Sequence, residues 1–256
     1  MFRRIAIGSY GVLCYVVFFA TFLYAIGFIG NFAVPRGIDA PREVSLPLAV
    51  CIDLWLLLAF AVQHSVMARP AFKRAWTKIV PKEAERSTYV LFSSLALIAL
   101  YAWWQPLGGV VWHAESMAAQ VLLWAGYGFG WGLLLLSTFL IDHFDLFGLR
   151  QSWYAFRGMP MPALEFRQPW LYRQVRHPLY VGWLCIFWFT PTMTVGHLVF
   201  AIGTTAYILV AIRFEERDLV DAHPEYEEYR KRVPMLVPRF GSRTTEDAPA
   251  KPAAVG

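Results

Sequence analysis

An uncharged run near the start of the chain restricts the possible folds more than any other feature. After Arg3 and Arg4, residues 5–30 contain no charged side chain. About 20 consecutive apolar residues are enough to cross the hydrocarbon core of a bilayer. Further apolar stretches follow at residues 54–63, 87–112 and 116–141. Because 57% of all residues are hydrophobic and only 16% are charged, the sequence predicts an all-α, polytopic integral membrane protein.

The first apolar run could be a secretory signal or a retained membrane helix. It is longer than the apolar core of a typical signal peptide, and no clear small-x-small cleavage site follows it. We therefore expect a retained helix. The cysteines Cys14, Cys51 and Cys185 lie inside apolar segments at unrelated spacings. They predict neither a disulfide framework nor a metal site.

Basic residues gather in particular connections between the apolar runs. Residues 67–87 and 142–177 are rich in lysine and arginine, as is the chain after Arg213, whereas the connection near residues 105–117 has neither. By the positive-inside rule the N-terminus and the basic connections are cytoplasmic. We expect both termini on that side of a bacterial inner membrane. Because the net charge of +5 follows this topology, we expect no nucleic-acid partner.

The apolar stretch at residues 178–212 must leave the cytoplasm and return, because both of its flanks are basic. Pro191 and Gly196 lie near its middle, where a helical hairpin would turn. The first arm is short for a full crossing, so a complete span and a re-entrant pair are both open alternatives. Beyond the hairpin, Pro224 suits the first turn of a short cytoplasmic amphipathic helix.

These features divide the chain into three regions. We expect a region of four transmembrane helices at residues 1–141. Residues 142–240 would contain a cytoplasmic loop, the helical hairpin and the C-terminal helix, and would hold a ligand. Residues 241–256 lack any apolar period and predict a disordered tail. The sequence leaves the oligomeric state open.

Two polar clusters flank the hairpin. The first, RHPLYVG, begins at Arg176, and the second, RFEERDL, begins at Arg213. The first could be an interfacial anchor, and the second could be an ordinary charge-paired helix end. A histidine–proline helix start, however, has free backbone N–H groups that favour an anion. The two clusters together, joined by a hairpin, favour a ligand site.

The motifs of this block resemble those of a known family. R-H-P-x-Y-x-G, R-x-E-E and H-P-x-Y-x-x-Y, within RHPLYVGW and RFEERDLVDAHPEYEEYRKRVPMLVP, are similar to the isoprenylcysteine carboxyl methyltransferase superfamily of membrane methyltransferases. Residues 61–95 and 137–158 resemble its methanethiol S-methyltransferase branch, which is related to nurim and NnrU-type proteins. The resemblance covers roughly residues 45–240. It implies S-adenosylmethionine-dependent methylation of methanethiol to dimethyl sulfide.

The resemblance also implies that the block at residues 170–238 forms the S-adenosylmethionine site. The matching positions are Gln174, Val175, His177, Pro178, Tyr180, Gly182, Arg213, Glu215 and Glu216. Arg213 and the helix-start amides would suit the carboxylate of the cofactor, and a glutamate would suit its ammonium or ribose hydroxyls. No G-x-G-x-x-G motif follows a predicted strand, which argues against a Rossmann-type methyltransferase domain.

A thiol acceptor reacts as its thiolate, so the acceptor site needs a base or a positive environment. Ionisable residues at membrane depth are candidates for such a role. We expect His143 as the base, with Asp142 and Asp145 beside it, and His64 as the alternative. Each of these residues could instead be an ordinary interfacial helix end.

The partners implied are a small thiol and the lipid bilayer. Two other functions are open at this point. One is methylation of a prenylcysteine carboxylate or a membrane lipid, and the other is a non-catalytic, nurim-like membrane protein. The presence of both cofactor clusters argues against the non-catalytic alternative.

Overall fold

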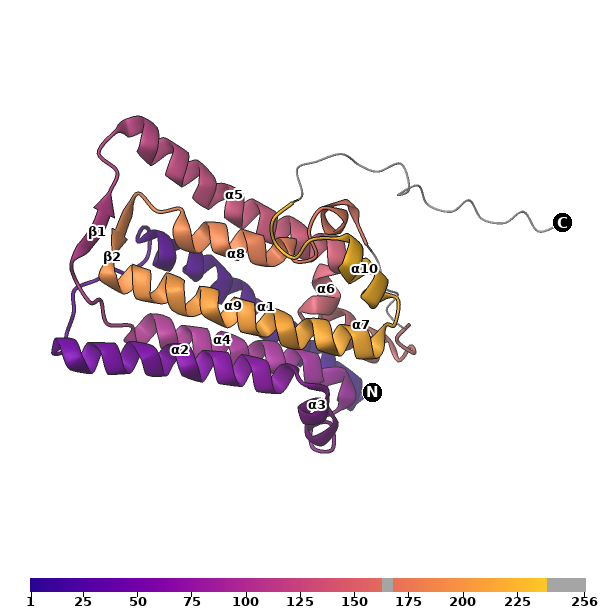
Figure 1. Ribbon diagram of the computed structural model, residues 1–256. Helices are drawn as coiled ribbons and strands as arrows, with labels where there is room; N and C mark the ends of the chain where they lie inside the picture. Colours follow the sequence, from indigo (N-terminus) through magenta and orange to yellow (C-terminus); the bar gives the residue numbers. More distant parts are fainter. Residues whose placement is uncertain (163–167, 239–256) are drawn as a thin grey trace.

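The computed structural model describes residues 1–162 and 168–238 and is predominantly helical (Figure 1). The longer helices are α1 (Phe2–Gly30), α2 (Leu46–Ala68), α4 (Glu85–Trp103), α5 (Met117–Ile141) and α9 (Val195–Ala222). The shorter ones are α3 (Pro70–Trp76), α6 (His143–Leu146), α7 (Leu149–Arg157), α8 (Pro178–Trp188), α10 (Tyr226–Arg232) and the 3-10 turns η1 (Lys82–Ala84) and η2 (Trp170–Arg173). Two short strands are β1 (Val110–His113) and β2 (Thr192–Thr194). The tail expected at residues 241–256 lies outside the described residues.

Four helices in the described residues are long and apolar enough to cross a membrane: α1, α2, α5 and α9. They confirm the predicted all-α, polytopic membrane fold. The span expected at residues 87–112 differs in detail, because α4 ends at Trp103 and residues 110–113 form a strand. Helix α4 begins with Glu85 and Arg86 and contains several buried hydroxyl residues. It packs against α1 and α2, so those hydroxyls face protein neighbours.

The predicted hairpin is present as two unequal arms. Helix α8 has 11 residues and α9 has 28, and β2 lies between them. Pro178 occupies the first turn of α8, where its missing N–H leaves no helical bond unmade. Strand β2 pairs antiparallel with β1, with Val110 opposite Thr194. The hairpin turn is therefore attached to the connection before α5, and α8 alone is too short to span the bilayer.

Helix α8 approaches α5 more closely than side chains usually permit. A side-chain carbon added at Gly182 would lie 2.9 Å from the Gly130 carbonyl oxygen and 2.9 Å from the Leu134 amide nitrogen. The corresponding carbon at Gly130 would lie 2.8 Å from the Gly182 carbonyl oxygen. Small residues allow membrane helices to pack at such short distances. The crossing fixes α8 and, with it, the segment that precedes its first residue.

The two ends of the helical bundle carry different elements. Figure 1 shows β1 and β2 at one end and α3, α6, α7 and α10 at the other, together with the N-terminus. We call the second of these the α10 end. An apolar core lies between the ends and includes Phe28, Leu100, Trp104, Ile186 and Ile212. The start of α8, the end of α9 and helix α10 therefore meet at the same end as the basic connections.

Candidate functional site

Glu216 joins three segments at the α10 end. Its Oε1 atom accepts hydrogen bonds from Arg176 Nε at 2.6 Å, from His177 Nε2 at 3.0 Å and from the Tyr226 hydroxyl at 3.5 Å. Glu216 is 8% exposed and His177 is 5% exposed. Burial raises the pKa of Tyr226 above its usual range, so the phenol stays protonated and able to donate. The carboxylate therefore ties the start of α8 and helix α10 to α9.

The segment that follows α10 packs on the start of α8. The amide of Arg176 donates to the Pro234 carbonyl at 2.9 Å, and the amide of His177 donates to the Met235 carbonyl at 3.2 Å. Arg176 Nη1 also donates to the Arg230 carbonyl at 2.9 Å. Backbone carbonyls therefore occupy the amides of Arg176 and His177, which precede the helix, whereas binding of an anion by the amides inside its first turn stays a prediction. A bound anionic group also needs side-chain donors.

Two arginine side chains can supply those donors. A groove of about 270 Å³ adjoins α9 and α10, and it is lined by Arg213, Glu216, Arg217, Val220, Asp221 and Arg230. Arg213 and Arg217 are exposed, and neither has an ion-pair partner within residues 1–162 and 168–238. Arg230, by contrast, pairs with Glu227 at 2.9 Å. Two unpaired guanidinium groups beside a groove suit a carboxylate ligand.

Glu215 lies among tyrosine side chains that come from several elements. Tyr180 donates its hydroxyl to Glu215 Oε2 at 2.8 Å. The carboxylate also interacts electrostatically with the phenols of Tyr89, Tyr172, Tyr207 and Tyr226. A carboxylate near aromatic rings suits a cation such as a sulfonium or an ammonium group. Helix α9 thus offers a negative group at Glu215 and positive groups at Arg213 and Arg217.

The other residues expected to contact a cofactor have different surroundings. Gln174 is exposed, whereas Val175 and Pro178 are buried. Gly182 lies in the crossing with α5, which gives it a packing role, and its contact with a cofactor stays a prediction. The members of the expected set that come together where α8 meets α9 are His177, Tyr180, Glu215 and Glu216.

His143, the expected base, is 5% exposed, and both of its ring nitrogens have partners. Thr138 uses its only hydroxyl proton on the Leu135 carbonyl at 2.7 Å, so it accepts from His143 Nδ1 at 2.9 Å. A neutral ring then has an unprotonated Nε2, which accepts from the Tyr15 hydroxyl at 2.9 Å. Burial lowers the pKa of His143 below its usual range, and nearby Asp142 opposes that shift. The ring is therefore neutral, with its lone pair on Nε2.

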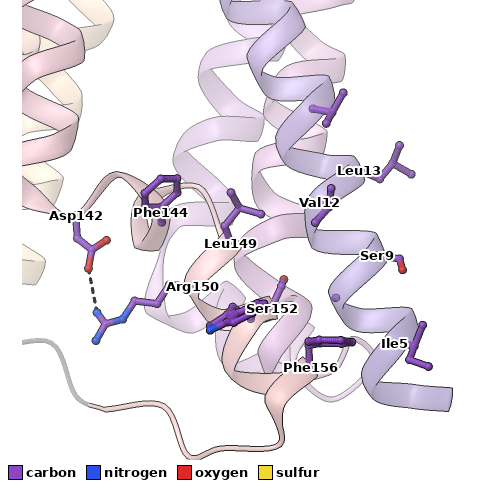
Figure 2. Close-up of a pocket in the computed structure, with 13 residues that line it drawn as sticks. Ile5, Ser9, Val12, Leu13, Asp142, Phe144, Leu149, Arg150, Ser152 and Phe156 are labelled. Carbon is purple, nitrogen blue, oxygen red and sulfur yellow. Dashed lines mark hydrogen bonds and ion pairs between the residues drawn. The ribbon is translucent and has the colours of Figure 1, made fainter. Parts of the chain in front are cut away.

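The two aspartates beside His143 bind an arginine instead of the imidazole. Asp142 accepts the amide of Asp145 at 3.1 Å and binds Arg150 through its other oxygen at 3.2 Å (Figure 2). Asp145 lies 3.5 Å from the same guanidinium group and accepts from Gln151 at 3.3 Å. Burial raises the pKa of the Asp145 carboxyl, and Arg150 opposes that rise. Two hydroxyls, and not an aspartate, therefore hold the His143 ring.

His64, the alternative base, belongs to a second polar cluster, between α2 and α4. Its Nε2 atom lies 2.9 Å from the Tyr89 hydroxyl, and its Nδ1 atom lies 3.0 Å from Ser93 Oγ. The ring stacks on Phe60 with centroids 5.2 Å apart. Tyr89 is also one of the phenols that interact with Glu215. This cluster therefore borders the block formed by α8 and α9.

Several of the side chains that contact the candidate residues were not predicted from the sequence. Arg176 and Tyr226 belong to the motifs R-H-P-x-Y-x-G and H-P-x-Y-x-x-Y, so the sequence did contain a signal for both. Tyr15 and Tyr89 gave no signal, because single tyrosines are common in apolar helices. Only the packing of α1 and α4 against their neighbours brings each of them to a histidine.

Several known proteins are similar to the chain over most of its length. It is 51% identical to methanethiol S-methyltransferase 2 of Bradyrhizobium diazoefficiens, with 100% of the chain and 99% of that protein covered. It is 52% identical to methanethiol S-methyltransferase of Crocosphaera subtropica, with 92% of each covered. Nurim of Xenopus laevis is 29% identical, with 84% of the chain and 82% of that protein covered. No family model and no solved structure matches the chain.

Proposed function

The chain belongs to the methanethiol S-methyltransferase family, and from that premise we propose that it transfers a methyl group from S-adenosylmethionine to methanethiol, which gives dimethyl sulfide. The observation that carries the proposal is the 51% identity over the full length of a relative with that name. The four apolar helices make the enzyme an integral membrane methyltransferase. Its acceptor is accordingly a small thiol.

The residues at the α8–α9 junction fit the charges of S-adenosylmethionine. The cofactor has a carboxylate, an ammonium and a sulfonium group, and when bound it supplies an electrophilic methyl group. Arg213 and Arg217 are suited to the carboxylate, because neither has an ion-pair partner among the described residues. Glu215, with Tyr180 beside it, is suited to the cationic groups. His177 and Glu216, which are bound to each other, would form a wall of the site, with Gln174, Val175, Pro178 and Gly182 in the adjoining turns.

The acceptor side must hold the thiol sulfur in line with the methyl group and exclude water. The thiol sulfur would form the new C–S bond as the bond between the methyl group and the sulfonium sulfur breaks. S-adenosylhomocysteine would leave, and the thiol proton would pass to a base. Our proposal for that base is His64, which is bound to the Tyr89 hydroxyl and lies beside the Tyr207 ring of α9, with ring centroids 6.3 Å apart. In the part of the chain that the structure describes, His64 makes a ring contact with α9, whereas no hydrogen bond, ion pair or ring contact joins His143 to α8 or α9. His143, with Asp142 and Asp145, is therefore the second candidate.

We also propose that the α10 end faces the cytoplasm of a bacterial cell, with the bundle in the inner membrane. The support is the positive-inside rule, together with the position of α3, α7 and α10 at one end (Figure 1). In this arrangement residues 1–141 are mainly scaffold, and residues 142–240 carry the cofactor site. Both termini would then be cytoplasmic.

A headspace assay tests the proposed function. Purified protein receives S-adenosylmethionine and methanethiol, and the gas above the solution is analysed for dimethyl sulfide. A prenylcysteine and phosphatidylethanolamine are offered in parallel as acceptors. We expect dimethyl sulfide only when protein, cofactor and thiol are all present. Methylation of the prenylcysteine or the lipid, without any dimethyl sulfide, would rule out the thiol as acceptor.

A further inference from the structure

A large groove lies between α1 and the α6–α7 segment, away from the methyl-transfer site. Its volume is about 910 Å³, and Figure 2 shows α1 on one side and α7 on the other. The lining residues are Ile5, Gly8, Ser9, Val12, Leu13, Val16, Asp142, Phe144, Leu149, Arg150, Ser152, Trp153 and Phe156. None of them belongs to α8, α9 or α10. The groove is thus separate from the proposed cofactor site.

The α1 wall of the groove is apolar and faces outward from the bundle. Val12, Leu13 and Val16 are 55%, 58% and 57% exposed, although they belong to a helix that can cross the membrane. Exposed apolar side chains on such a helix contact lipid chains. From Ile5 to Val16 the helix rises about 16 Å, which is roughly half of a hydrocarbon core of about 30 Å. The groove therefore has the length of one bilayer leaflet.

The floor of the groove is a tight contact between two helices. A side-chain carbon added at Gly8 of α1 would lie 3.2 Å from Phe156 Cβ of α7. On the α7 side the wall continues through Trp153 and Leu149. The close contact joins the two walls of the groove.

Two arginines mark the end of the groove nearest the N-terminus. The guanidinium group of Arg4 packs over Gly158, where an added side-chain carbon would lie 2.2 Å from Arg4 Nη1. Arg157 lies over the Trp153 ring, 5.5 Å from its centroid. Neither arginine has a carboxylate partner among residues 1–162 and 168–238, whereas neighbouring Arg3 lies 3.5 Å from Glu83. The groove is thus apolar along its length and has at one end two arginines without a carboxylate partner among the described residues. These features complement a phosphate with an attached acyl chain.

We propose that this groove binds one phospholipid of the bilayer, with an acyl chain along Ile5–Val16 and the phosphate at Arg4 and Arg157. The lipid is a resident ligand and not a methyl acceptor. It fills the space between α1 and α7, and it therefore holds the α6–α7 segment, including Asp142 and Arg150, against the bundle.

Lipid retention by the purified protein tests this site. The protein is exchanged extensively into lipid-free detergent, and native mass spectrometry counts the phospholipids that stay bound. We expect one tightly held phospholipid on the wild-type chain and at least a fivefold lower occupancy in Ser9→Trp, which fills the trough. The matched control is Gly132→Trp on α5, where an added side-chain carbon meets nothing within 4 Å. This control should retain the lipid.

The charged end is tested by a second pair of variants and by added ligands. Arg4→Gln with Arg157→Gln should lower the occupancy, whereas Arg3→Gln should not. Added phosphatidylglycerol should raise the unfolding temperature of the delipidated protein, and inorganic phosphate alone should not. Equal retention in all variants, or an equal thermal shift from inorganic phosphate, would overturn the proposal. These readouts do not depend on methyl transfer, so a failure of the lipid proposal can be distinguished from a failure of the proposed function.

Discussion

The structure contains two histidine–tyrosine pairs that are each formed between two helices. His64 lies 2.9 Å from the Tyr89 hydroxyl between α2 and α4, and His143 lies 2.9 Å from the Tyr15 hydroxyl between α1 and α6. The hydrogen bonds are of the same length, but the surroundings differ. Both rings stack on a phenylalanine and are held at Nδ1 by a hydroxyl. The His64 ring also contacts Tyr207 of α9, whereas among the described residues no ring of α9 contacts His143.

A neutral histidine with both ring nitrogens hydrogen-bonded is therefore not enough to identify a base. His143 meets the intrinsic requirement, because it is neutral with a lone pair on Nε2. That lone pair, however, faces a tyrosine of α1, next to the lipid-facing groove. His64 is less deeply buried, but its ring contacts Tyr207 of α9, the helix that carries Glu215. The two pairs differ in their position relative to the proposed cofactor site.

The largest expected effect is on turnover. His64→Ala should lower kcat by about a hundredfold or more, the usual scale for a general base, with cofactor affinity retained. His143→Ala should lower it by less than about tenfold, through local packing. Dimethyl sulfide formation at saturating substrates measures both. The reverse result, in which His143→Ala or Asp142→Asn with Asp145→Asn abolishes turnover and His64→Ala does not, would move the acceptor site to the α5–α6 side.

Cofactor affinity should respond to a different histidine. His177→Ala removes a donor from the buried Glu216 carboxylate, and we expect binding of S-adenosylmethionine to weaken by roughly tenfold. Titration calorimetry measures the affinity, and Lys231→Ala on the exposed face of α10 is the control. Unchanged affinity in His177→Ala would remove this residue from the site. The loss of kcat in His64→Ala would then have no variant with weakened cofactor binding to be compared with.

The tyrosine partners should differ in the same direction as their histidines, though less. Tyr89→Phe keeps the ring and removes the hydroxyl that is bound to His64, so kcat should fall by about fivefold with little change in KM. Tyr15→Phe should change kcat by less than about twofold. If the two variants have equal activity, Tyr89 does not take part in proton transfer.

The smallest expected effect is a change in stability with pH. Burial lowers the pKa of His143 in the folded protein, so the unfolded chain binds the proton more readily. Stability is therefore lost as the pH falls below the unfolded value of about 6.5 and toward the lower folded value. His143→Gln should reduce this loss. Unfolding temperatures at pH 7.5, 6.5 and 5.5 provide the measurement, and an unchanged slope in the variant would contradict a buried neutral ring.

The fold was largely predictable because its strongest signals are local. Uncharged runs identify α1 and α5 by length alone, and Pro191 with Gly196 locates the hairpin turn. The early end of α4 at Trp103 was not predictable from hydropathy. The residues that follow it are also uncharged, and residues 110–113 form a strand that pairs with β2.

The candidate site was predictable where a motif carried it and not where packing made it. The motifs gave His177, Tyr180, Glu215 and Glu216, which meet at the α8–α9 junction. They could not show that the amides of residues 176 and 177 would be covered, since the carbonyls that cover them lie almost sixty residues later. Likewise, the motifs could not show that the fold of α6 and α7 brings both aspartates to Arg150 and not to His143.

The contact between the start of α8 and the segment after α10 also sets an order of events during synthesis. Chains emerge from the ribosome at about 5–20 residues per second, so Pro234 and Met235 appear roughly 3–12 seconds after Arg176 and His177. During that interval the nascent chain already contains α1, α2 and α5, but the carbonyls that complete the α8 start do not yet exist. The membrane scaffold is therefore synthesised before the proposed cofactor site can be assembled. A stalled or prematurely terminated chain would occupy the bilayer without consuming the cofactor.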